Sequence, residues 1–356
     1  MKVYTFGADY NTPVELLYSL RPENRDSVFQ QFIDQNPWQE VHKITDCDVA
    51  IFPHKAFDPE TLQRNDKCFL AAQEAKAYNK PIIIDAASDC DAPLNIPTAN
   101  ILRLGLYQSL QQPYETERPY WISQKNQDYL VPLPINKRRD KPVIGFCGSV
   151  GSEGKLFQVG GAIPLRVGRK ILGKGRVSQK VDIRLKKGMS HRLRGASMQN
   201  LVADSRITTN FDITNQLQDY YNPNNPNRQL LEQKFANNLA DCEYNLCVRG
   251  NGNYSIRFFM TLMAGRIPVV LDTDCVFPFE EKLHLIRVPV SGIDRIGDFV
   301  LQHFESVSDQ ELIEMQQENR EVYQNYMAPH KFIPSFIESV VDRSRDRAYA
   351  NSAVNY

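Results

Sequence analysis

Residues 244–281 read YNLCVRGNGNYSIRFFMTLMAGRIPVVLDTDCVFPFEE, and they decide the fold that the sequence predicts. Residues 244–248 and 267–271 are short apolar runs, which are typical of buried strands. Between them, residues 254–264 have the length and composition of a helix, and Gly265 follows at the place of a C′ residue. This order predicts a βαβ unit.

The turn at residues 249–253 brings the chain to the start of the predicted helix. Its two glycines and two asparagines favour turns and positive φ. A helix start attracts anions, because its first N–H groups are unpaired and the helix dipole is positive there. Arg249 precedes this point, Arg257 lies just inside the helix, and Ser255 adds a hydroxyl group. Two interpretations stay open: a cradle for a pyrophosphate, or an ordinary turn whose arginines pair with surface carboxylates.

The same stretch resembles the exostosin family of glycosyltransferases, in the form of its soluble, bacterial-type members. The family's motif elements are matched by Cys247-Val248-Arg249-Gly250, Ser255-Ile256-Arg257, Gly265-Arg266-Ile267-Pro268-Val269-Val270, Asp272 and Pro278-Phe279-Glu280. Two positions depart from the family pattern, since Val248 replaces the usual proline and Met260 stands where a glutamate is usual. In sugar-nucleotide transferases of this fold, a carboxylate near that position often holds the ribose hydroxyls. We therefore expect one of the acids after the second strand to supply this contact.

The resemblance implies an α/β fold of the GT-B type, in which two Rossmann-like lobes with parallel sheets face each other across a cleft. Strand patterns that alternate with helical ones agree with this fold. The proline-rich, charged stretch 132–142 predicts the linker between the lobes. We expect an N-terminal acceptor-side lobe at 1–135, a C-terminal nucleotide-sugar-binding lobe at 136–328, and a helix at 329–356 that crosses back to the first lobe.

The resemblance further implies an inverting glycosyltransferase of the hexosyl or glycuronosyl type, active in polysaccharide biosynthesis. The expected substrates are a nucleotide-sugar donor, with UDP as the nucleotide, and the hydroxyl group of a glycan or glycolipid acceptor. The expected donor-binding residues are Gly148, Ser149, Arg166, Arg169, Arg249, Gly250, Asn251, Ser255, Ile256, Arg257 and Asp272. The general base is expected from the first lobe, at Asp9, with Asp89 as the second candidate. The alternative, which Met260 favours, is a catalytically inactive protein on the same fold that binds nucleotide-sugars or glycans.

No cofactor and no metal ion are expected, because enzymes of this fold class stabilise the departing diphosphate with their own positive groups. Asp272-Thr273-Asp274 does form a DxD sequence. We interpret it as a loop at a strand end. Contact with a metal ion or with the donor's ribose is the alternative.

The composition excludes several other classes of protein. The chain of 356 residues has 42 basic and 42 acidic residues, so no global charge favours nucleic acid or membrane as a partner. No apolar run is long enough to cross a bilayer, which leaves peripheral membrane contact at most. Seven cysteines without a CxxC pair indicate reduced thiols. We expect a soluble cytoplasmic protein.

Residues 166–194 form a basic block with eleven Lys or Arg residues against a single acid, Asp182. Such a block binds nucleic acid in some proteins, through the phosphates. This one lacks the interleaved aromatic residues that stack on bases. We expect part of it to attract an anionic substrate and the rest to be solvated.

The helix that leads into the first strand of the βαβ unit is predicted at residues 227–240. Leu230, Leu231, Phe235 and Leu239 recur along it at helical spacing. This pattern predicts that all four leucine and phenylalanine side chains line one buried face.

Overall fold

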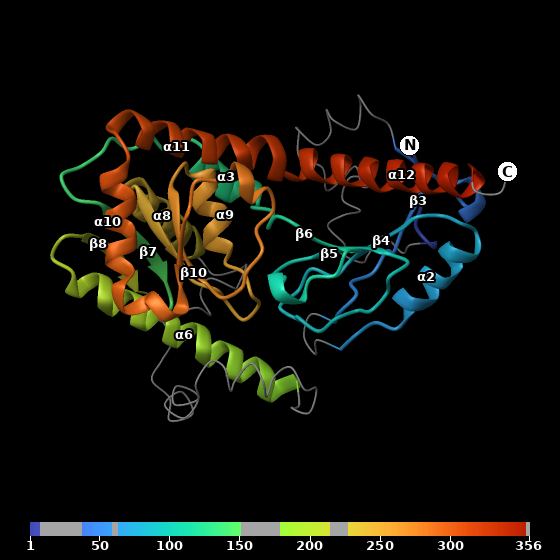
Figure 1. The fold of residues 1–356 in the computed structure, drawn as a ribbon, viewed down its shortest axis with the longest axis horizontal. Helices are drawn as coiled ribbons and strands as arrows, with labels where there is room; N and C mark the ends of the chain where they lie inside the picture. The colour runs from blue at the N-terminus through green and yellow to red at the C-terminus, as the bar shows by residue number, and fades with distance from the viewer. Residues whose placement is uncertain (8–37, 59–62, 151–178, 214–226, 354–356) are drawn as a thin grey trace. The chain divides into compact units, whose positions relative to one another are not determined.

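The computed structural model describes residues 1–7, 38–58, 63–150, 179–213 and 227–353 (Figure 1). The chain divides into two compact units, each with its own sheet, and each is described by itself. Unit 1 comprises Met1–Pro119, Val276–Pro278 and Tyr326–Tyr356. Unit 2 comprises Tyr120–Cys275 and Phe279–Asn325.

Unit 2 is built on a parallel sheet of five strands in the order β11-β10-β9-β7-β8. The strands are β7 (Val143–Gly148), β8 (Thr208–Ile213), β9 (Tyr244–Cys247), β10 (Ile267–Asp272) and β11 (Ile286–Pro289). All four residues of β9 and the first five of β10 are buried. Such continuous burial is expected of central parallel strands, because helices cover both faces of the sheet.

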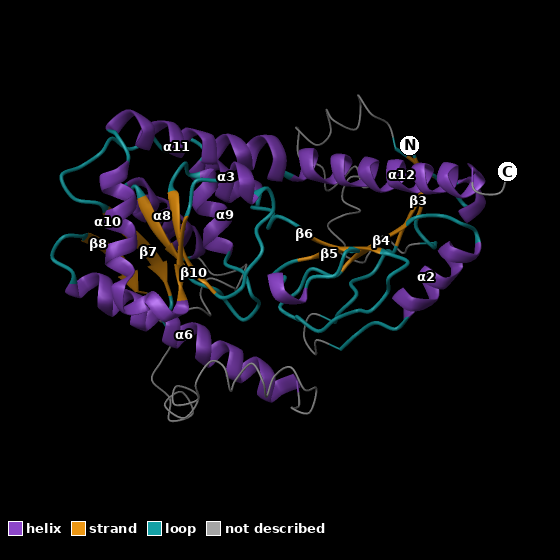
Figure 2. Cartoon of the chain, viewed as in Figure 1, coloured by secondary structure: helices purple, strands orange, loops and turns teal. Residues whose placement is uncertain are grey.

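The helices of unit 2 pack in two groups (Figure 2). One group contains α6 (Gln179–Ala203), η6 (Val290–Arg295) and α10 (Ile296–Ser306). The other contains α3 (Gln124–Leu130), α8 (Arg228–Ala240), α9 (Ile256–Met263) and α11 (Asp309–Val322), and the short η5 (Glu280–Lys282) precedes β11. The prediction of a βαβ unit is confirmed, since β9, α9 and β10 follow one another and the two strands pair in parallel.

Local sequence explains where the helices of unit 2 begin and end. Gly265 follows α9 with a φ of 65°, and its N–H donates to the carbonyl of Leu262. The N–H of Arg266 donates to the carbonyl of Thr261, which completes a Schellman motif. At the start of α11, Ser308 caps the helix in a capping box with Glu311.

Helix α8 differs from its prediction in the residues that it buries. Phe235 and Leu239 are buried as expected, but Leu230 is 64% exposed. Glu232 is buried instead, because Lys125 of α3 and Arg228 both pair with its carboxylate, at 2.9 Å and 3.1 Å. Ion pairing thus turns a polar side chain inward, which apolar spacing does not reveal.

Unit 1 has a parallel sheet of six strands in the order β2-β1-β3-β4-β5-β6. The strands are β1 (Lys2–Tyr4), β2 (Gln39–Glu40), β3 (Val49–Ile51), β4 (Ile82–Asp85), β5 (Asn100–Arg103) and β6 (Glu115–Glu117). The helices described in this unit are η3 (Ile44–Asp46), α2 (Lys67–Ala77), η4 (Gln108–Leu110) and α12 (Pro329–Ala353). The two parallel sheets confirm the prediction of an α/β fold with two Rossmann-like lobes.

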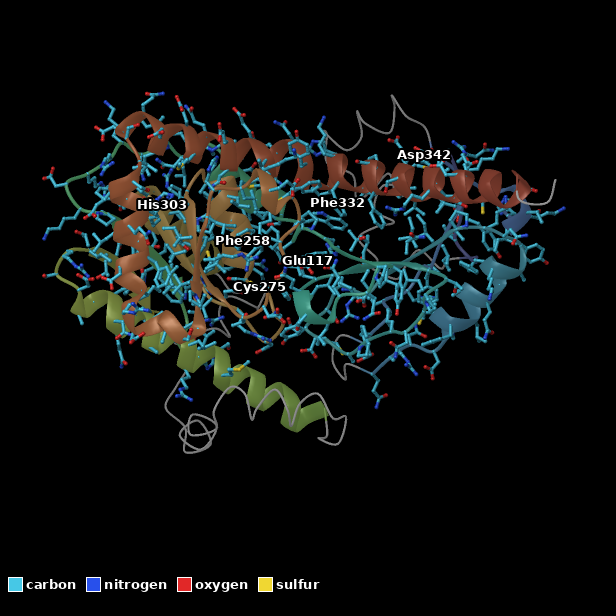
Figure 3. The ribbon with its side chains drawn as sticks, in the orientation of Figure 1. Glu117, Phe258, Cys275, His303, Phe332 and Asp342 are labelled. Carbon is cyan, nitrogen blue, oxygen red and sulfur yellow. The ribbon has the colours of Figure 1, made fainter. Side chains whose placement is uncertain are left out.

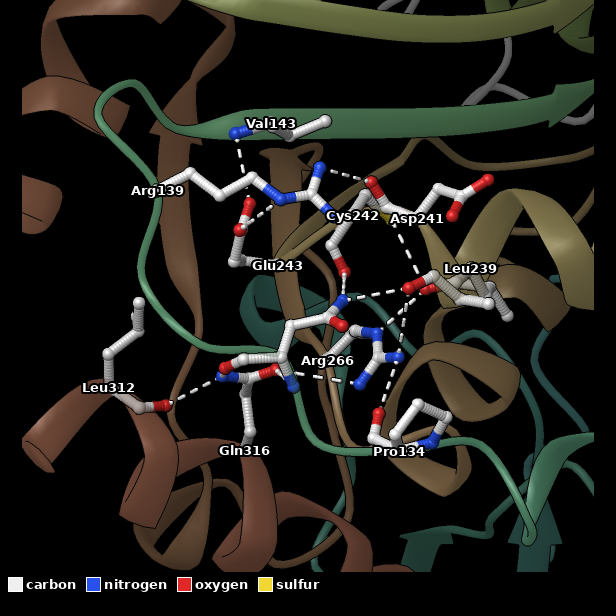
Figure 4. Close-up of polar contacts among 12 residues, drawn as sticks. Pro134, Arg139, Val143, Leu239, Asp241, Cys242, Glu243, Arg266, Leu312 and Gln316 are labelled. Atoms are coloured by element: carbon white, nitrogen blue, oxygen red, sulfur yellow. Dashed lines mark hydrogen bonds and ion pairs between the residues drawn. The ribbon is translucent and has the colours of Figure 1, made fainter. Parts of the chain in front are cut away.

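The chain passes from unit 1 to unit 2 after Pro119, whereas the sequence predicted a boundary at 135/136. The predicted linker belongs to unit 2 because buried arginines hold it. Arg266, with no exposed surface, donates to the carbonyls of Pro134 and Leu239 (Figure 4). It also donates to the carbonyl of Gly265. Arg320 donates to the carbonyl of Leu133 at 2.7 Å.

Asn136 and Gln316 fix the same segment further along. The backbone N–H of Asn136 donates to Gln316 Oε1, and Gln316 Nε2 donates back to the carbonyl of Asn136. The side-chain amide of Asn136 donates to the carbonyls of Ala240 and Cys242. Burial lowers the pKa of Arg266 to about 10, which leaves this guanidinium charged at neutral pH.

The chain returns to unit 1 within a π-helix, η7 (Tyr323–Met327), which joins α11 to α12. The hydroxyl of Tyr323 accepts from the N–H of Ile122 and donates to the carbonyl of Tyr120, both at 3.1 Å. These bonds tie the end of α11 to the first residues of unit 2. Helix α12 belongs to unit 1, where Arg343 donates to Asn100 Oδ1.

Candidate functional site

The sheet of unit 2 reverses its strand order between β7 and β9. From β7 the chain moves outward to β8, and it then returns to β9 on the other side of β7. In open α/β sheets such a switch point opens a crevice at the carboxyl ends of the strands, where ligands bind. Gly148 is the last residue of β7, and Ser149 follows it. The turn that starts at Arg249 follows β9. The fold therefore brings together two segments about a hundred residues apart.

Arg257, in the first turn of α9, reaches back to the end of β7. Its Nε donates to the carbonyl of Cys147 at 2.8 Å. Its Cζ lies 4.6 Å from the centroid of the Phe146 ring, a cation–π contact. Gly148 adopts a φ of 148°, and a Cβ on Gly148 would overlap Nη2 of Arg257 and lie 2.8 Å from Cζ. The glycine thus makes the room that this guanidinium occupies.

Arg249 is held by the turn that it starts. Its Nη1 donates to Asn253 Oδ1 and its Nη2 to the carbonyl of Asn251, both at 3.0 Å. The turn closes through the N–H of Gly250, which donates to the carbonyl of Tyr254 at 2.8 Å. Arg249 is only 4% exposed, so the turn keeps a charged guanidinium inside the protein at the strand end.

Ser255 is the N-cap of α9, with an extended backbone at φ −130° and ψ 121°. It is 8% exposed, and within the described part of the chain its Oγ has no hydrogen-bond partner. Ile256 is the first helical residue, and the N–H groups of the first turn of any helix lack an intrahelical acceptor. A buried hydroxyl and a helix start next to two arginines form a site suited to an anion.

A third arginine lies at this switch point, and the sequence did not single it out. Arg194 of α6 donates through Nη1 to the carbonyl of Ser149 at 3.0 Å and through Nη2 to the carbonyl of Arg249 at 2.9 Å. It is 8% exposed. The sequence placed it in a basic block without assigning it a role. Its partners are backbone atoms of residues 45 and 55 positions away, so only topology identifies it.

Asp272 ends β10 and lies in a network of its own. Its Oδ1 accepts from the N–H of Asp274 at 2.9 Å and forms an ion pair with Arg287 of β11 at 3.2 Å. Arg287 also binds both carboxylate oxygens of Glu280, each at 2.6 Å. Arg287 thus compensates the charge of two of the acids that could replace the family glutamate.

Asn253 links this loop to the turn after β9. Its Oδ1 accepts from the hydroxyl of Thr273 at 2.7 Å as well as from Arg249. Its amide nitrogen lies 3.4 Å from the carbonyl oxygen of Asp274. The middle residue of the DxD sequence is therefore an anchor for the turn, and the loop interpretation of this sequence agrees with the geometry.

Met260 lies one turn after Arg257 and is 6% exposed. Its side chain is a thioether, which offers no strong hydrogen bond to a ribose.

The remaining predicted residues fall elsewhere. Asp9, Arg166 and Arg169 lie outside the described residues. Asp89 lies in the loop after β4 of unit 1 and is half-buried.

The carboxyl edge of unit 1 also holds buried charged groups that the sequence did not indicate, among them Glu117, which Figure 3 labels. Glu117 accepts from the N–H groups of Gly105 and Leu106, both at 2.7 Å, and burial raises its pKa to about 8. Asp85 pairs with Arg118 at 3.6 Å. Glu117 thus holds the backbone at Gly105 and Leu106, and Asp85 accepts from the N–H of Ala87 in its own loop at 3.0 Å.

Two general features concern the described residues as a whole. All seven cysteines are buried free thiols, and burial raises the pKa of Cys147 to about 11 and that of Cys247 to about 12. These thiols are protonated at neutral pH. No helix in the described ranges is both long and apolar enough to cross a membrane.

No protein-family model matches the sequence, and no curated protein matches it. The structure is similar to that of a glycosyltransferase from Rickettsia africae ESF-5, with a TM-score of 0.40 and 9% identity over 96% of this chain and 98% of that one. It is also similar to sucrose-phosphate synthase from Thermosynechococcus elongatus, with a TM-score of 0.30 and 11% identity over 92% of this chain and 71% of that one. A third similar structure is TarM, with a TM-score of 0.34 and 11% identity over 88% of this chain and 53% of that one. Similarities this weak assign no activity. The description of this chain as an α/β protein with two parallel sheets therefore rests on the strand order and the contacts given above.

Proposed function

We propose that this protein is an inverting glycosyltransferase of the GT-B type, related to the exostosin family, which uses a UDP-sugar as donor. The observation that carries the proposal is the convergence of Arg249, Arg257 and the start of α9 at the switch point of unit 2. Among their contacts, Arg249 donates to Asn253 Oδ1 and to the carbonyl of Asn251, and Arg257 donates to the carbonyl of Cys147. A nucleoside diphosphate is the class of anion that guanidinium groups bind through charge-assisted hydrogen bonds.

In the proposed reaction, the acceptor hydroxyl attacks the anomeric carbon of the donor sugar and its oxygen forms the new glycosidic bond. The bond between that carbon and the diphosphate oxygen breaks, and the electron pair leaves with the diphosphate. Arg249, Arg257, the Ser255 hydroxyl and the first N–H groups of α9 stabilise the charge that develops there. A general base takes the hydroxyl proton. Asp9 and Asp89 remain the proposed candidates for this base, and a hexosyl or glycuronosyl group and a glycan or glycolipid acceptor remain the proposed substrates.

The test is a two-step screen on the intact protein. Binding is measured first, by thermal shift with UDP, UDP-sugars and the corresponding GDP- and ADP-sugars, because a ligand of the native state raises the melting temperature. Transfer is then measured as UDP release in the presence of glycan acceptors, and the anomeric configuration of the product is determined by NMR. We expect a UDP-specific shift and inversion. Retention of configuration, or a shift only with another nucleotide, would contradict the proposal.

Met260 keeps one alternative open, a protein on the same fold that binds the donor without transferring the sugar. The buried thioether at the position of the family glutamate favours it. The variant Met260→Glu separates the two functions. If the natural protein transfers sugar, one of Asp272, Asp274, Glu280 and Glu281 already holds the ribose, and Met260→Glu changes donor affinity by no more than about 1–2 kcal/mol. If the natural protein is inactive and the variant gains activity, the binding protein is the correct assignment.

A further inference from the structure

The two loops that make up the anion site leave adjacent strands. Strands β7 and β9 pair through Ile144 and Gly145 of β7, well before their carboxyl ends. Beyond that point the two segments are joined through side chains from helices. Arg257 of α9 contacts the end of β7, and Arg194 of α6 contacts both segments.

Arg194 is suited to join two segments because its guanidinium is a rigid fork. Nη1 and Nη2 donate in fixed, diverging directions, here to the carbonyl of Ser149 at 3.0 Å and to that of Arg249 at 2.9 Å. A lysine ammonium is a point charge on a flexible stem, so it does not impose the same geometry on two acceptors. One planar group thus donates to both loops.

The same contacts affect the charge that an anion would meet. The carbonyl oxygens of Ser149 and Arg249 lie at the edge of the sheet where the anion is proposed to bind, and bare carbonyl oxygens repel anions. Arg194 donates a hydrogen bond to each of these carbonyl oxygens and so offsets their partial negative charge. It also adds a positive charge in a low-dielectric position, since it is 8% exposed. Helices α6 and α9 belong to different packing groups of unit 2, so the site receives guanidiniums from two separate layers.

We propose that Arg194 is a positioning residue that sets the spacing of the Ser149 and Arg249 loops and so makes the site competent to bind a diphosphate. We call this bridging of the two loops by Arg194 the clamp. The identity of the anion rests on the proposed function, whereas the clamp rests on the two hydrogen bonds of Arg194.

The experiment compares three variants of the full chain with the wild type. Arg194→Met keeps the aliphatic stem but removes charge and fork. Arg194→Lys keeps the charge and removes only the fork. Arg192→Met is the matched control, because Arg192 is exposed on the same helix two residues earlier. All four proteins are checked by circular dichroism and thermal unfolding before the site is tested.

The first readout is amide hydrogen exchange of residues 148–150 and 249–253 without ligand. We expect faster exchange in Arg194→Lys and Arg194→Met, and unchanged exchange in Arg192→Met, because the two loops lose their common donor. The second readout is the dissociation constant of inorganic pyrophosphate. We expect it to rise roughly tenfold or more in both Arg194 variants, the range for losing charge-assisted contacts, and to stay unchanged in the control.

The outcomes separate the clamp from the proposed function. Wild-type exchange in the loops of both Arg194 variants would overturn the clamp, and so would wild-type pyrophosphate affinity in Arg194→Lys, because charge alone would then suffice. Should Arg194→Met fail to fold, Arg194→Lys carries both readouts. If the wild type binds no pyrophosphate while the loops of both variants exchange faster, the clamp stands and the proposed donor site is wrong.

Discussion

The guanidinium of Arg257 fills the space that a side chain on Gly148 would need, since a Cβ on this glycine would lie 2.8 Å from Cζ of the arginine. These residues are 109 positions apart in the sequence, yet the position of the Arg257 guanidinium requires a glycine at position 148. Gly148 also has a φ of 148°, which L side chains rarely adopt. The pair marks the point where β7 and α9 meet at the carboxyl edge of the sheet.

Gly148→Ala is expected to displace Arg257 and so to weaken UDP binding roughly tenfold or more, because the new methyl group takes the place of the guanidinium. The atom that the methyl group meets is the end of a flexible side chain, but the φ of 148° adds backbone strain, so circular dichroism and thermal unfolding first establish that the variant folds. Isothermal titration with UDP measures the effect. Gly188→Ala is the control, since nothing lies within 4 Å of a Cβ at Gly188.

A double-mutant cycle makes this prediction sharper. Arg257→Ala alone should weaken UDP binding roughly ten- to a hundredfold, as expected for a charge-assisted contact to phosphate. Adding Gly148→Ala to Arg257→Ala should then cost little more, because both changes remove the same contact. Additive losses in the double variant would show that Gly148 acts independently of Arg257.

Activity is expected to survive chelation. Arg287 already compensates the charge of Asp272, at 3.2 Å, and the N–H of Asp274 donates to the same Asp272 oxygen atom. Transfer rates in EDTA should therefore equal those in buffer. Complete loss in EDTA, with recovery in Mn²⁺ or Mg²⁺, would instead assign Asp272 and Asp274 as metal ligands.

Arg266 is expected to be a major contributor to the stability of unit 2. In Arg266→Met, the carbonyls of Pro134, Leu239 and Gly265 lose a buried donor, and each unsatisfied group costs about 1–3 kcal/mol. Urea unfolding should show a loss of at least about 3 kcal/mol. Arg206→Met, at an exposed arginine in surface ion pairs, should leave the urea midpoint close to that of the wild type. Equal losses in both variants would refute the importance of the buried network.

Stability of unit 2 should fall on mild acidification because of His303. Burial, with a smaller contribution from repulsion by His284, lowers the pKa of His303, whose Nδ1 lies 3.0 Å from the Tyr244 hydroxyl. The unfolded chain binds a proton near the ordinary value of 6.5, whereas the folded protein binds it only at lower pH. The free energy of unfolding should thus be constant above this value and should decrease as the pH falls below it.

Urea titrations between pH 5 and 8, with His303→Gln as the comparison, measure this effect. The glutamine variant should lose the part of the pH dependence that His303 contributes. His42→Gln, at an exposed position in unit 1, should retain it. If the profile of His303→Gln matches that of the wild type, another group is responsible.

The sequence by itself determined the βαβ unit at the centre of unit 2. Apolar strand patterns, a helix of ordinary length and Gly265 at its end are local signals, and each acts within a few residues. The observed Schellman motif, with Gly265 at a φ of 65°, follows from them directly. The α/β class follows as well, because strands separated by helices are forced to pair in parallel.

Only the tertiary structure decided the places of residues whose contacts lie far away in the sequence. Arg194 looked like one residue of a basic block, and Leu230 like a core residue, because the partners that determine their places are distant in sequence or are backbone carbonyls. A carbonyl oxygen has no signature in the sequence, since every residue has one. For the same reason the sequence does not reveal that Arg266 and Arg320 hold the segment at Leu133 and Pro134 through its carbonyls, and the fold makes this segment part of unit 2.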